Sequence, residues 1–248
     1  MHVLGIDVGG SGIKGAVVDI ETGELVTERH RIKTPKGAEP EDVAKVVAKI
    51  AKHFNWQGPI GIGFPGPIKG GVIMMIANLS QRWAGLDAAS LFAEVTGCPV
   101  TIANDADVAG LAEMTFGAGK KQPGTVIMIT LGTGIGTAIF THGHLVPNTE
   151  FGHVEVNGKD AETRASDAAR QREEMSWKKY AKRLTRYFNT LEMLFWPDLF
   201  IIGGGISKEH ENFLPLLEIK TKIIPAQMLN EAGIVGAALA TQGLQVKK

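Results

Sequence analysis

The sequence predicts an α/β fold made of two related domains, and two observations carry this prediction. Short apolar runs typical of buried strands alternate along the chain with segments whose apolar residues recur at helical spacing. In addition, a strand, a glycine-rich turn and a second strand occur in residues 3–20 and again in residues 125–140. Two copies of one supersecondary unit favour two domains of similar construction.

The first part of the chain has the pattern of a sheet with helices between its strands. The expected elements are, in order, strands over 3–8, 13–20 and 25–32, a helix over 40–54, a strand over 59–64, a helix over 86–96, a strand over 100–103 and a helix over 108–116. The strand that ends at Phe64 runs into the stiff turn Pro65-Gly66-Pro67. The next strand delivers Asn104 and Asp105 into an expected loop.

The pattern restarts at Gly124. The expected elements are strands over 125–131 and 137–140, a long helical region over 160–195 that Pro197 ends, a strand over 199–202 and an alanine-rich helix over 233–244. We expect a small N-terminal domain over 1–107, onto which the C-terminal helix within 230–248 packs back. A larger C-terminal domain is expected over 108–229.

Composition excludes several classes of protein. The 26 Lys and Arg balance 26 Asp and Glu, so the chain offers no electrostatic footprint for nucleic acid or an anionic membrane. Its one cysteine, Cys98, excludes a disulfide within the chain and a cysteine-based zinc cluster. We find no signal peptide and no run of roughly 20 apolar residues. A cytoplasmic setting without membrane contact is therefore expected.

The glycine turns are candidate phosphate sites. Gly10 to Gly15 match G-x-G-x-x-G, but strand-forming residues follow where a dinucleotide site needs a helix, and no Walker A motif occurs. A glycine hairpin can still turn its backbone N–H groups toward an anion, although a tight turn without ligand is the simpler alternative. A second such turn and the run Gly203-Gly204-Gly205 favour phosphate binding. The candidates are Asp7, Gly9, Gly10, Ser11, Gly12, Lys14, Thr130, Gly132, Thr133 and Gly134. Asp7 could also orient Mg²⁺ through water.

If a phosphate bound at these turns is transferred to a hydroxyl, a base is needed near that hydroxyl, and Asp105 is a candidate for it. It directly follows a buried strand, and Asn104 could hydrogen-bond neighbouring hydroxyls of an acceptor. The alternative is that Asn104 and Asp105 cap the helix that follows, and spacing alone does not separate the two. Glu150 and His153, three residues apart, could bind vicinal hydroxyls or form a surface turn with a satisfied histidine.

Taken together, these segments resemble the ROK family of actin-like sugar kinases. IDVGGSGIKG (6–15), TLGTGIG (130–136) and IIGGGI (201–206) resemble the two phosphate motifs and the adenosine motif, and ANDAD (103–107) and EFGH (150–153) resemble the sugar-site motifs. The match runs nearly end to end. The short length and the segments 197–208 and 230–238 resemble the polyphosphate-using members of the family.

This resemblance implies an actin-like, ribonuclease H-like fold of two domains with an interdomain cleft. It implies transfer of a phosphoryl group from inorganic polyphosphate, and from ATP, to the 6-hydroxyl of glucose, with Mg²⁺ as cofactor and Asp105 as base. Gly203, Gly204 and Gly205 are implied for the nucleotide, and a homodimer is implied as the assembly. The implied glucose contacts are Asn104, Asp105, Glu150, His153, Glu162, Asn78 and Gly66.

Many ROK members hold zinc through three cysteines and the counterpart of His153. This chain has no cysteine in the region, so no zinc is expected and hydrogen bonds must orient His153. The alternatives are an ATP-dependent kinase for mannose, another hexose or an N-acetylhexosamine, and a sugar-sensing regulator. Such regulators carry an N-terminal DNA-binding module, for which a first strand at Val3 leaves no room.

A polymeric donor needs an extended positive surface, whereas ATP does not. Lys14, Lys120 and Lys121 are near the predicted phosphate turns in sequence. A larger group lies in the long helical region: Arg164, Arg170, Arg172, Lys178, Lys179, Lys182, Arg183 and Arg186. The alternative for many of these is a solvated helix face with Glu173 and Glu174 as ion-pair partners.

Overall fold

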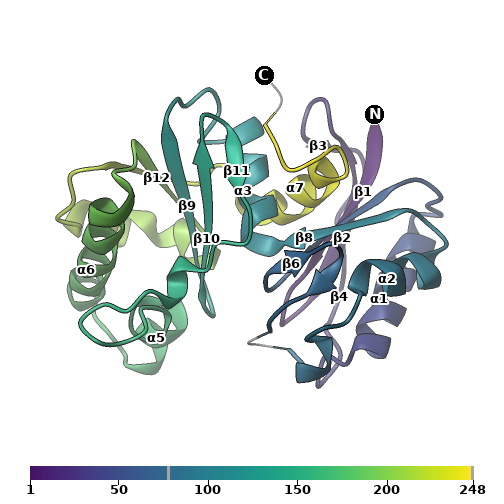
Figure 1. Cartoon of the computed structure of the whole chain (residues 1–248), viewed down its shortest axis with the longest axis horizontal. Helices are drawn as coiled ribbons and strands as arrows, with labels where there is room; N and C mark the ends of the chain where they lie inside the picture. Colours follow the sequence, from purple (N-terminus) through teal and green to yellow (C-terminus); the bar gives the residue numbers. More distant parts are fainter. Residues whose placement is uncertain (77–78, 247–248) are drawn as a thin grey trace. The chain divides into compact units, whose positions relative to one another are not determined.

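The computed structural model describes residues 1–76 and 79–246, and the chain forms two compact units (Figure 1). Unit 1 is Met1–Ala112 with Glu231–Gln245, and unit 2 is Glu113–Asn230 with Val246–Lys248. The chain therefore passes between the units after Ala112, after Asn230 and, close to its end, after Gln245. The first passage lies inside one helix, α3 (Asp105–Thr115), five residues beyond the boundary expected from sequence.

Unit 1 contains a mixed sheet in the order β3-β2-β1-β5-β8, with β4 also paired to β2. Its strands are β1 (His2–Val8), β2 (Ile13–Asp19), β3 (Glu24–Leu25), β4 (His30–Ile32), β5 (Ile60–Phe64) and β8 (Val100–Asn104). A separate two-stranded hairpin is formed by β6 (Ile68–Lys69) and β7 (Val72–Ile73). β1 and β2 are antiparallel, whereas β1, β5 and β8 run parallel to one another. The ends of β1, β5 and β8 therefore meet at one edge of this sheet.

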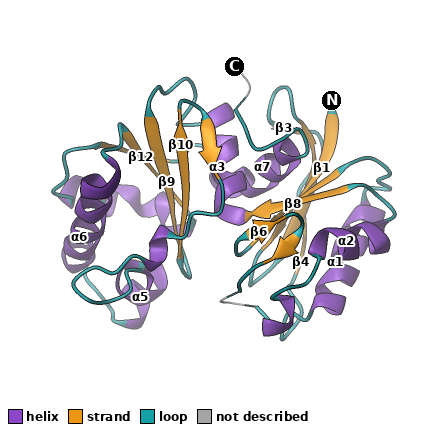
Figure 2. Cartoon of the chain, viewed as in Figure 1, coloured by secondary structure: helices purple, strands orange, loops and turns teal. Residues whose placement is uncertain are grey.

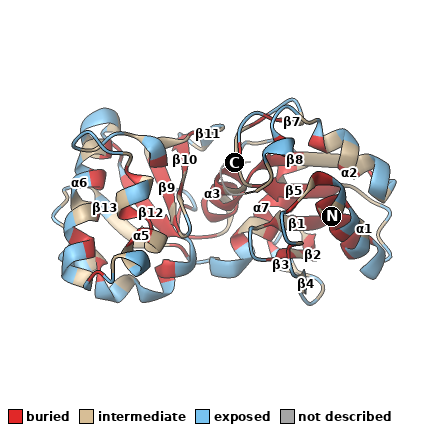
Figure 3. Cartoon of the chain, turned by 90° about the horizontal axis from the view of Figure 1, so that it is seen from below, coloured by how far each residue is buried: buried red, intermediate tan, exposed pale blue. Residues whose placement is uncertain are grey.

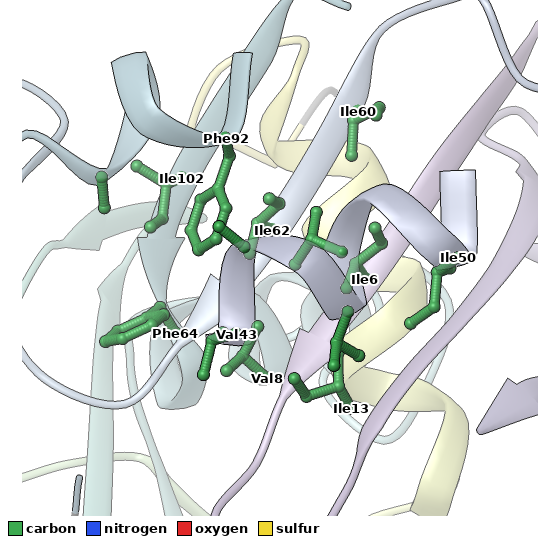
Figure 4. Close-up of a cluster of buried hydrophobic side chains, with 14 of the residues drawn as sticks. Ile6, Val8, Ile13, Val43, Ile50, Ile60, Ile62, Phe64, Phe92 and Ile102 are labelled. Atoms are coloured by element: carbon green, nitrogen blue, oxygen red, sulfur yellow. The ribbon is translucent and has the colours of Figure 1, made fainter. Parts of the chain in front are cut away.

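Helices cover both faces of that sheet. α1 (Pro40–His53) and α2 (Ala88–Thr96) enclose the main apolar core, in which Ile6, Ile62 and Phe92 are fully buried (Figure 4). α7 (Ala232–Ala240), drawn in yellow in Figure 1, lies against β1 and β5 on the other face. Successive strand residues point to opposite faces, so Gly5 and Gly61 face α7 while their neighbours enter the core.

Unit 2 repeats this plan. Its sheet has the order β11-β10-β9-β12-β13, with β9 and β10 antiparallel and β9, β12 and β13 parallel. The strands are β9 (Thr125–Leu131), β10 (Ile135–Thr141), β11 (His144–Val146), β12 (Leu199–Gly203) and β13 (Lys222–Pro225). α6 (Trp177–Phe195) packs on it through contacts such as Phe188 with Phe200. The α/β class and the repeated unit predicted from sequence are confirmed (Figure 2).

The prediction of one continuous helical region over 160–195 is wrong. It consists of α4 (Glu162–Ala165), α5 (Asp167–Arg172) and α6. Ser166 and Ser176 interrupt it, because each adopts an extended backbone and accepts a hydrogen bond through its side chain from the N–H three residues later. Six apolar residues of α6 are buried as the spacing predicts, whereas Leu194, near the end of the helix, is half-exposed. Figure 3 shows buried and exposed residues alternating along the ribbon of α6.

Two smaller expectations also need correction. The strand expected over 25–32 is divided into β3 and β4, because the hydroxyl oxygen of Thr27 accepts the N–H of Val17 at 3.0 Å in place of a strand carbonyl. The last helix ends at Ala240, short of the expected residue 244. Among the described residues, no helix combines the length and the apolar character that crossing a bilayer requires.

The contact of α7 with β5 yields a stability prediction. A Cβ added to Gly61 would lie 1.7 Å from the carbonyl oxygen of Ala237, and backbone cannot rotate away as a side chain can. We expect Gly61→Ala to lower the free energy of unfolding by about 3 kcal/mol or more, measured by urea denaturation. Gly10→Ala is the control, because nothing lies within 4 Å of its added Cβ. Equal stability of the two variants would contradict this packing.

Candidate active site

The first glycine turn joins β1 to β2. Val8 pairs with Ile13, which leaves residues 9–12 as the turn, closed by a bond from Gly9 N to Gly12 O at 3.2 Å. The Thr34 hydroxyl donates to Gly9 O at 2.6 Å, so the turn is fixed from outside as well. Gly10 is exposed, and nothing lies within 4 Å of a Cβ placed on it. This turn therefore offers rigid backbone beside open space, as an anion site requires.

Asp7 lies at the end of β1, opposite Lys14 on β2. Lys14 Nζ is 3.3 Å from Asp7 Oδ2, and both side chains are partly exposed. Gly233, near the start of α7, is so close that a Cβ there would be 3.0 Å from Asp7 Cγ. Asp7 is thus a positioned, partly exposed carboxylate with oxygen ligands that suit Mg²⁺, and its donor chemistry fits the expected ion.

Arg31 belongs to this region although the sequence did not single it out. It pairs with Lys14 across β2 and β4, donates through its guanidinium to Ser11 O at 3.0 Å, and lies against Gly12. A second exposed cation therefore stands at the first turn. The alternation of charged and apolar residues around Arg31 predicts a strand, but only the register of that strand brings it to the turn.

The second glycine turn, between β9 and β10, has the same construction. Leu131 pairs with Ile135, and Gly132 N donates to Gly134 O at 3.0 Å. Gly132, like Gly10, has nothing within 4 Å of an added Cβ. Thr133 is the exposed tip of the turn, and Thr130 precedes it on β9. The two turns predicted as a pair are therefore alike in two respects. Each is closed by a backbone hydrogen bond, and each has one glycine with open space where a Cβ would be.

The run Gly203-Gly204-Gly205 lies beside this second turn. Gly203 pairs with Thr130 in the parallel register of β12 and β9. Gly204 has a φ of +82°, and a Cβ on it would be 2.3 Å from Leu131 O. Only glycine fits this approach, since other residues would meet both the backbone and an unfavourable φ. Within unit 2, the segment expected for the nucleotide therefore adjoins a segment expected for phosphate.

Asn104 and Asp105 lie at the junction of β8 and α3, where the expectation of a loop is wrong. The helix begins at Asp105 itself. Asn104 Oδ1 accepts the N–H groups of Ala106 and Asp107 at 2.9 and 3.0 Å, and this capping allows the helix to start three residues early. The capping alternative is thus realised for Asn104. Asp105 remains half-buried at the edge where β8 ends, and its Oδ1 also accepts the Ala106 N–H, at 2.8 Å.

Three of the predicted sugar-site residues lie together in unit 2. The segment that carries Glu150 and His153 is pressed on β10, because a Cβ at Gly152 would be 2.0 Å from Ile135 O. Glu162 reaches the same place from α4, where its Oε2 accepts the N–H of Ile135 at 2.8 Å. Burial raises the pKa of Glu150, an effect that the nearby His153 opposes and Glu162 reinforces. Glu162 thus supports the strand that leaves the second phosphate turn.

His153 is oriented by Asp160, a residue that the sequence did not single out. His153 Nδ1 lies 2.8 Å from Asp160 Oδ2. This hydrogen bond is the main cause that raises the pKa of His153, against the opposing effect of partial burial. In the described part of the chain, no three His, Cys, Asp or Glu side chains are grouped as metal ligands. A hydrogen bond therefore fixes this imidazole.

Gly66, another predicted sugar contact, follows the end of β5. Gly66 has a φ of +120°, and a Cβ there would be 2.4 Å from Met75 O, so the turn itself requires glycine. The turn therefore explains why residue 66 is glycine. A contact of Gly66 with the sugar stays a prediction. Asn78 lies outside the described residues.

Comparison with known proteins places the chain among sugar kinases. The sequence model of the ROK family matches residues 3–166. A polyphosphate glucokinase of Mycobacterium tuberculosis is 49% identical over 97% of this chain and 91% of its own. The crystal structure of an inorganic polyphosphate/ATP-glucomannokinase from Arthrobacter sp. strain KM superposes with a TM-score of 0.94 at 49% identity, over 97% of this chain and 99% of that one.

A ROK family glucokinase from Streptomyces griseus, crystallised with glucose and AMPPNP, has a TM-score of 0.79 at 25% identity, over 98% of this chain and all of that one. These matches cover both units. They confirm the predicted sugar-kinase fold.

The pair of His153 and Asp160 leads to a pH prediction. Because the folded state raises the pKa of His153, the stability that the pair contributes is present below the ordinary value near 6.5 and is lost as pH rises through the folded pKa. Asp160→Asn should therefore move the NMR titration midpoint of His153 to lower pH. Asp167→Asn, which removes an acid bonded to Arg170 instead, should leave the midpoint in place. An unchanged midpoint in Asp160→Asn would exclude Asp160 as the cause.

Proposed function

The chain belongs to the ROK family, and we propose from this that it is a kinase that phosphorylates the 6-hydroxyl of glucose with inorganic polyphosphate, and also with ATP, as donor. The observation that carries the proposal is the pair of closed glycine turns, each with one glycine open to solvent. One belongs to the unit with Asp105 and the other to the unit with Glu150, His153 and Glu162. The polyphosphate glucokinase and glucomannokinase relatives support the choice of substrates.

In the proposed mechanism, Asp105 accepts the proton of the 6-hydroxyl while that oxygen attacks the terminal phosphorus of the donor in line with the departing oxygen. Its position at the first turn of α3 restricts how the carboxylate can move, since Oδ1 is already bonded to backbone N–H. Backbone N–H groups of Gly10, Gly12 and Gly134 stabilise the charge of the transferring group, whereas the N–H of Gly132, also expected to do so, already donates to Gly134 O.

Lys14 and Arg31 add positive charge beside the first turn, where the phosphate chain is proposed to bind. Asp7 is the proposed holder of Mg²⁺, through water. When bound, the ion would neutralise charge on the donor phosphates. The pairing of Asp7 with Lys14 keeps its carboxylate from swinging toward solvent.

Glu150, His153 and Glu162 are the proposed hydroxyl acceptors and donors for the sugar, together with Asn104. A carboxylate accepts a sugar hydroxyl best when it is ionised, and burial makes Glu150 harder to ionise. The hydrogen bond between Asp160 and Nδ1 orients the His153 ring, and the other ring nitrogen, Nε2, lies on the side of the ring away from Asp160. Mannose is a second proposed acceptor, because the relative from Arthrobacter is named for both hexoses.

Charge in unit 2 supports a polymeric donor. Residues 162–186 contain eight Lys and Arg against four Asp and Glu, although the whole chain is neutral. Arg164, Arg172 and Arg183 surround one carboxylate, Glu173, whose pKa is lowered to about 2, chiefly by hydrogen bonds from Arg183. One acid cannot neutralise three guanidinium groups, so this side of α4 and α5 carries excess positive charge.

That cluster is attached to the second turn. Ala168 N, in α5, donates to Gly132 O at 3.0 Å, and the Arg172 guanidinium donates to the Thr163 carbonyl on α4. A phosphate chain whose end occupies the turn could therefore continue toward Arg164 and Arg172.

The homodimer expected from the family stays a prediction.

Replacing the proposed base tests the chemistry. We expect Asp105→Asn to lower kcat by about a thousandfold, since proton transfer to a positioned carboxylate is lost, while glucose binding measured by calorimetry changes little. Asp87→Asn is the matched control, because Asp87 also accepts a backbone N–H at the start of a helix in unit 1. Near-normal turnover of Asp105→Asn would refute the assignment.

Donor choice is tested with glucose, Mg²⁺ and either ATP or long-chain polyphosphate as the sole donor. We expect polyphosphate to support turnover, with a KM that rises more steeply with added KCl than the KM for ATP, because more charges are screened. Arg164→Ala and Arg172→Ala should raise the polyphosphate KM and flatten its salt dependence. Lys222→Ala is the control, since Lys222 pairs with Leu199 at the opposite end of the sheet from the turn. No turnover with polyphosphate would overturn the proposed donor.

A further inference from the structure

Glu113 is a fully buried acid that the proposed mechanism does not use. It stands near the end of α3, immediately after the chain has passed from unit 1 into unit 2. Its Oε2 accepts the N–H of Ala118 at 2.8 Å and that of Gln227 at 3.1 Å, and its Oε1 accepts the N–H of Met228 at 2.7 Å. All three donors are backbone groups of unit 2. The carboxylate thus joins two segments that are more than a hundred residues apart in sequence.

The second of those segments is the return passage to unit 1. Gln227 and Met228 follow β13 and precede the passage after Asn230, and α7 begins directly beyond it. Glu113 therefore ties the outgoing and the returning chain together on the unit 2 side. On the unit 1 side the same two helices touch through backbone, because a Cβ at Gly236 of α7 would be 1.6 Å from Val108 O of α3.

The passages after Ala112 and after Asn230 both adjoin proposed reacting groups of unit 1. α3 starts at Asp105, about two turns before Glu113. α7 starts beside Asp7, which is within contact distance of Gly233. A shift at Glu113 would be transmitted along α3 to the proposed base, and a shift at Gln227 and Met228 would be transmitted through the short turn over Leu229–Glu231 to α7, beside the proposed holder of Mg²⁺.

The fit of the carboxylate is specific. A Cβ at Gly117 would lie 2.1 Å from Glu113 Oε2, so that glycine makes room for it. Three N–H donors converge on two oxygens, and a buried acid without such partners would be strongly unfavourable. Glutamine would turn an amide NH₂ toward one of these N–H groups and lose at least one bond. The site is therefore built for a side chain that offers two acceptor oxygens to three N–H donors.

We propose that Glu113 is a positioning residue, which fixes the passages after Ala112 and Asn230 to each other and thereby holds Asp105, at the start of α3, and Asp7, beside α7, in place during transfer. This inference rests on the proposed kinase function. Without the carboxylate, unit 2 would still fold around its own core, but the two passages would move separately. The loss should then appear in the rate of transfer and not in the binding of a ligand held by unit 2 alone.

Glu113→Gln tests this, with Glu192→Gln as the matched control. Glu192 also accepts two backbone N–H groups within unit 2, those of Lys220 and Thr221, but it lies far in sequence from both passages. We expect Glu113→Gln to lower kcat for glucose phosphorylation at least about tenfold, since small misplacements of reacting groups are costly. The dissociation constant for ADP, whose proposed contacts lie in unit 2, should stay within about twofold. Glu192→Gln should lower the melting temperature and leave kcat unchanged.

Several outcomes would overturn the proposal. Wild-type kcat in Glu113→Gln would do so, as would a parallel loss of kcat and ADP binding, or an equal loss of kcat in Glu192→Gln. If Glu113→Gln does not fold, Glu113→Asp, which keeps the charge but shortens the reach, is measured in the same way. Failure of both variants to fold would reduce Glu113 to a core residue of unit 2. Absence of turnover in the wild type would instead refute the kinase function.

Discussion

Close approach of backbone to backbone is the constraint on which this architecture depends. α7 can lie on β1 and β5 only because Gly5 and Gly61 place no side chain between them and the helix. The same approach brings Gly236 against Val108 of α3 and Gly233 against Asp7. Glycine therefore serves more than the phosphate turns in this chain. Gly5, Gly61, Gly233 and Gly236 allow the C-terminal helix to pack closely on the N-terminal sheet and on α3, and this packing fixes where the proposed reacting carboxylates lie.

The features that the sequence predicted are those set by local pattern. Alternation and glycine turns define β1, β2, β9 and β10, and the spacing of apolar residues defines the buried face of α6. The error over 160–195 has a local cause too, since Ser166 and Ser176 are good capping residues inside an otherwise helical pattern. The early start of α3 is similar, because Asn104 is both the last strand residue and the cap of the helix.

What the sequence could not reveal depends on contacts between distant segments. Arg31 reaches the first turn through the pairing of β4 with β2, and Asp160 reaches His153 across a short bridge between strand-like segments. Glu113 is the clearest case, since its partners are Gln227 and Met228. A glutamate on a helix of alanine and apolar residues predicts an exposed side chain or an ion pair. Only the fold shows that it is buried and bonded to backbone.

In unit 2, the carboxylates of Glu113 and Glu162 both accept backbone N–H groups. Glu162 shows what this means for the proposed site. Its Oε2 holds Ile135 at the exit of the second glycine turn, and a Cβ at Gly134 would lie 2.3 Å from the same atom. If a sugar hydroxyl bonds to Glu162, it does so beside an oxygen that already fixes the donor turn. Acceptor and donor would then share one carboxylate, so the position of the sugar and the shape of the phosphate turn are mechanically linked. The repeated plan of strand, glycine turn and strand provides the rigid backbone, and the acid from α4 provides the link.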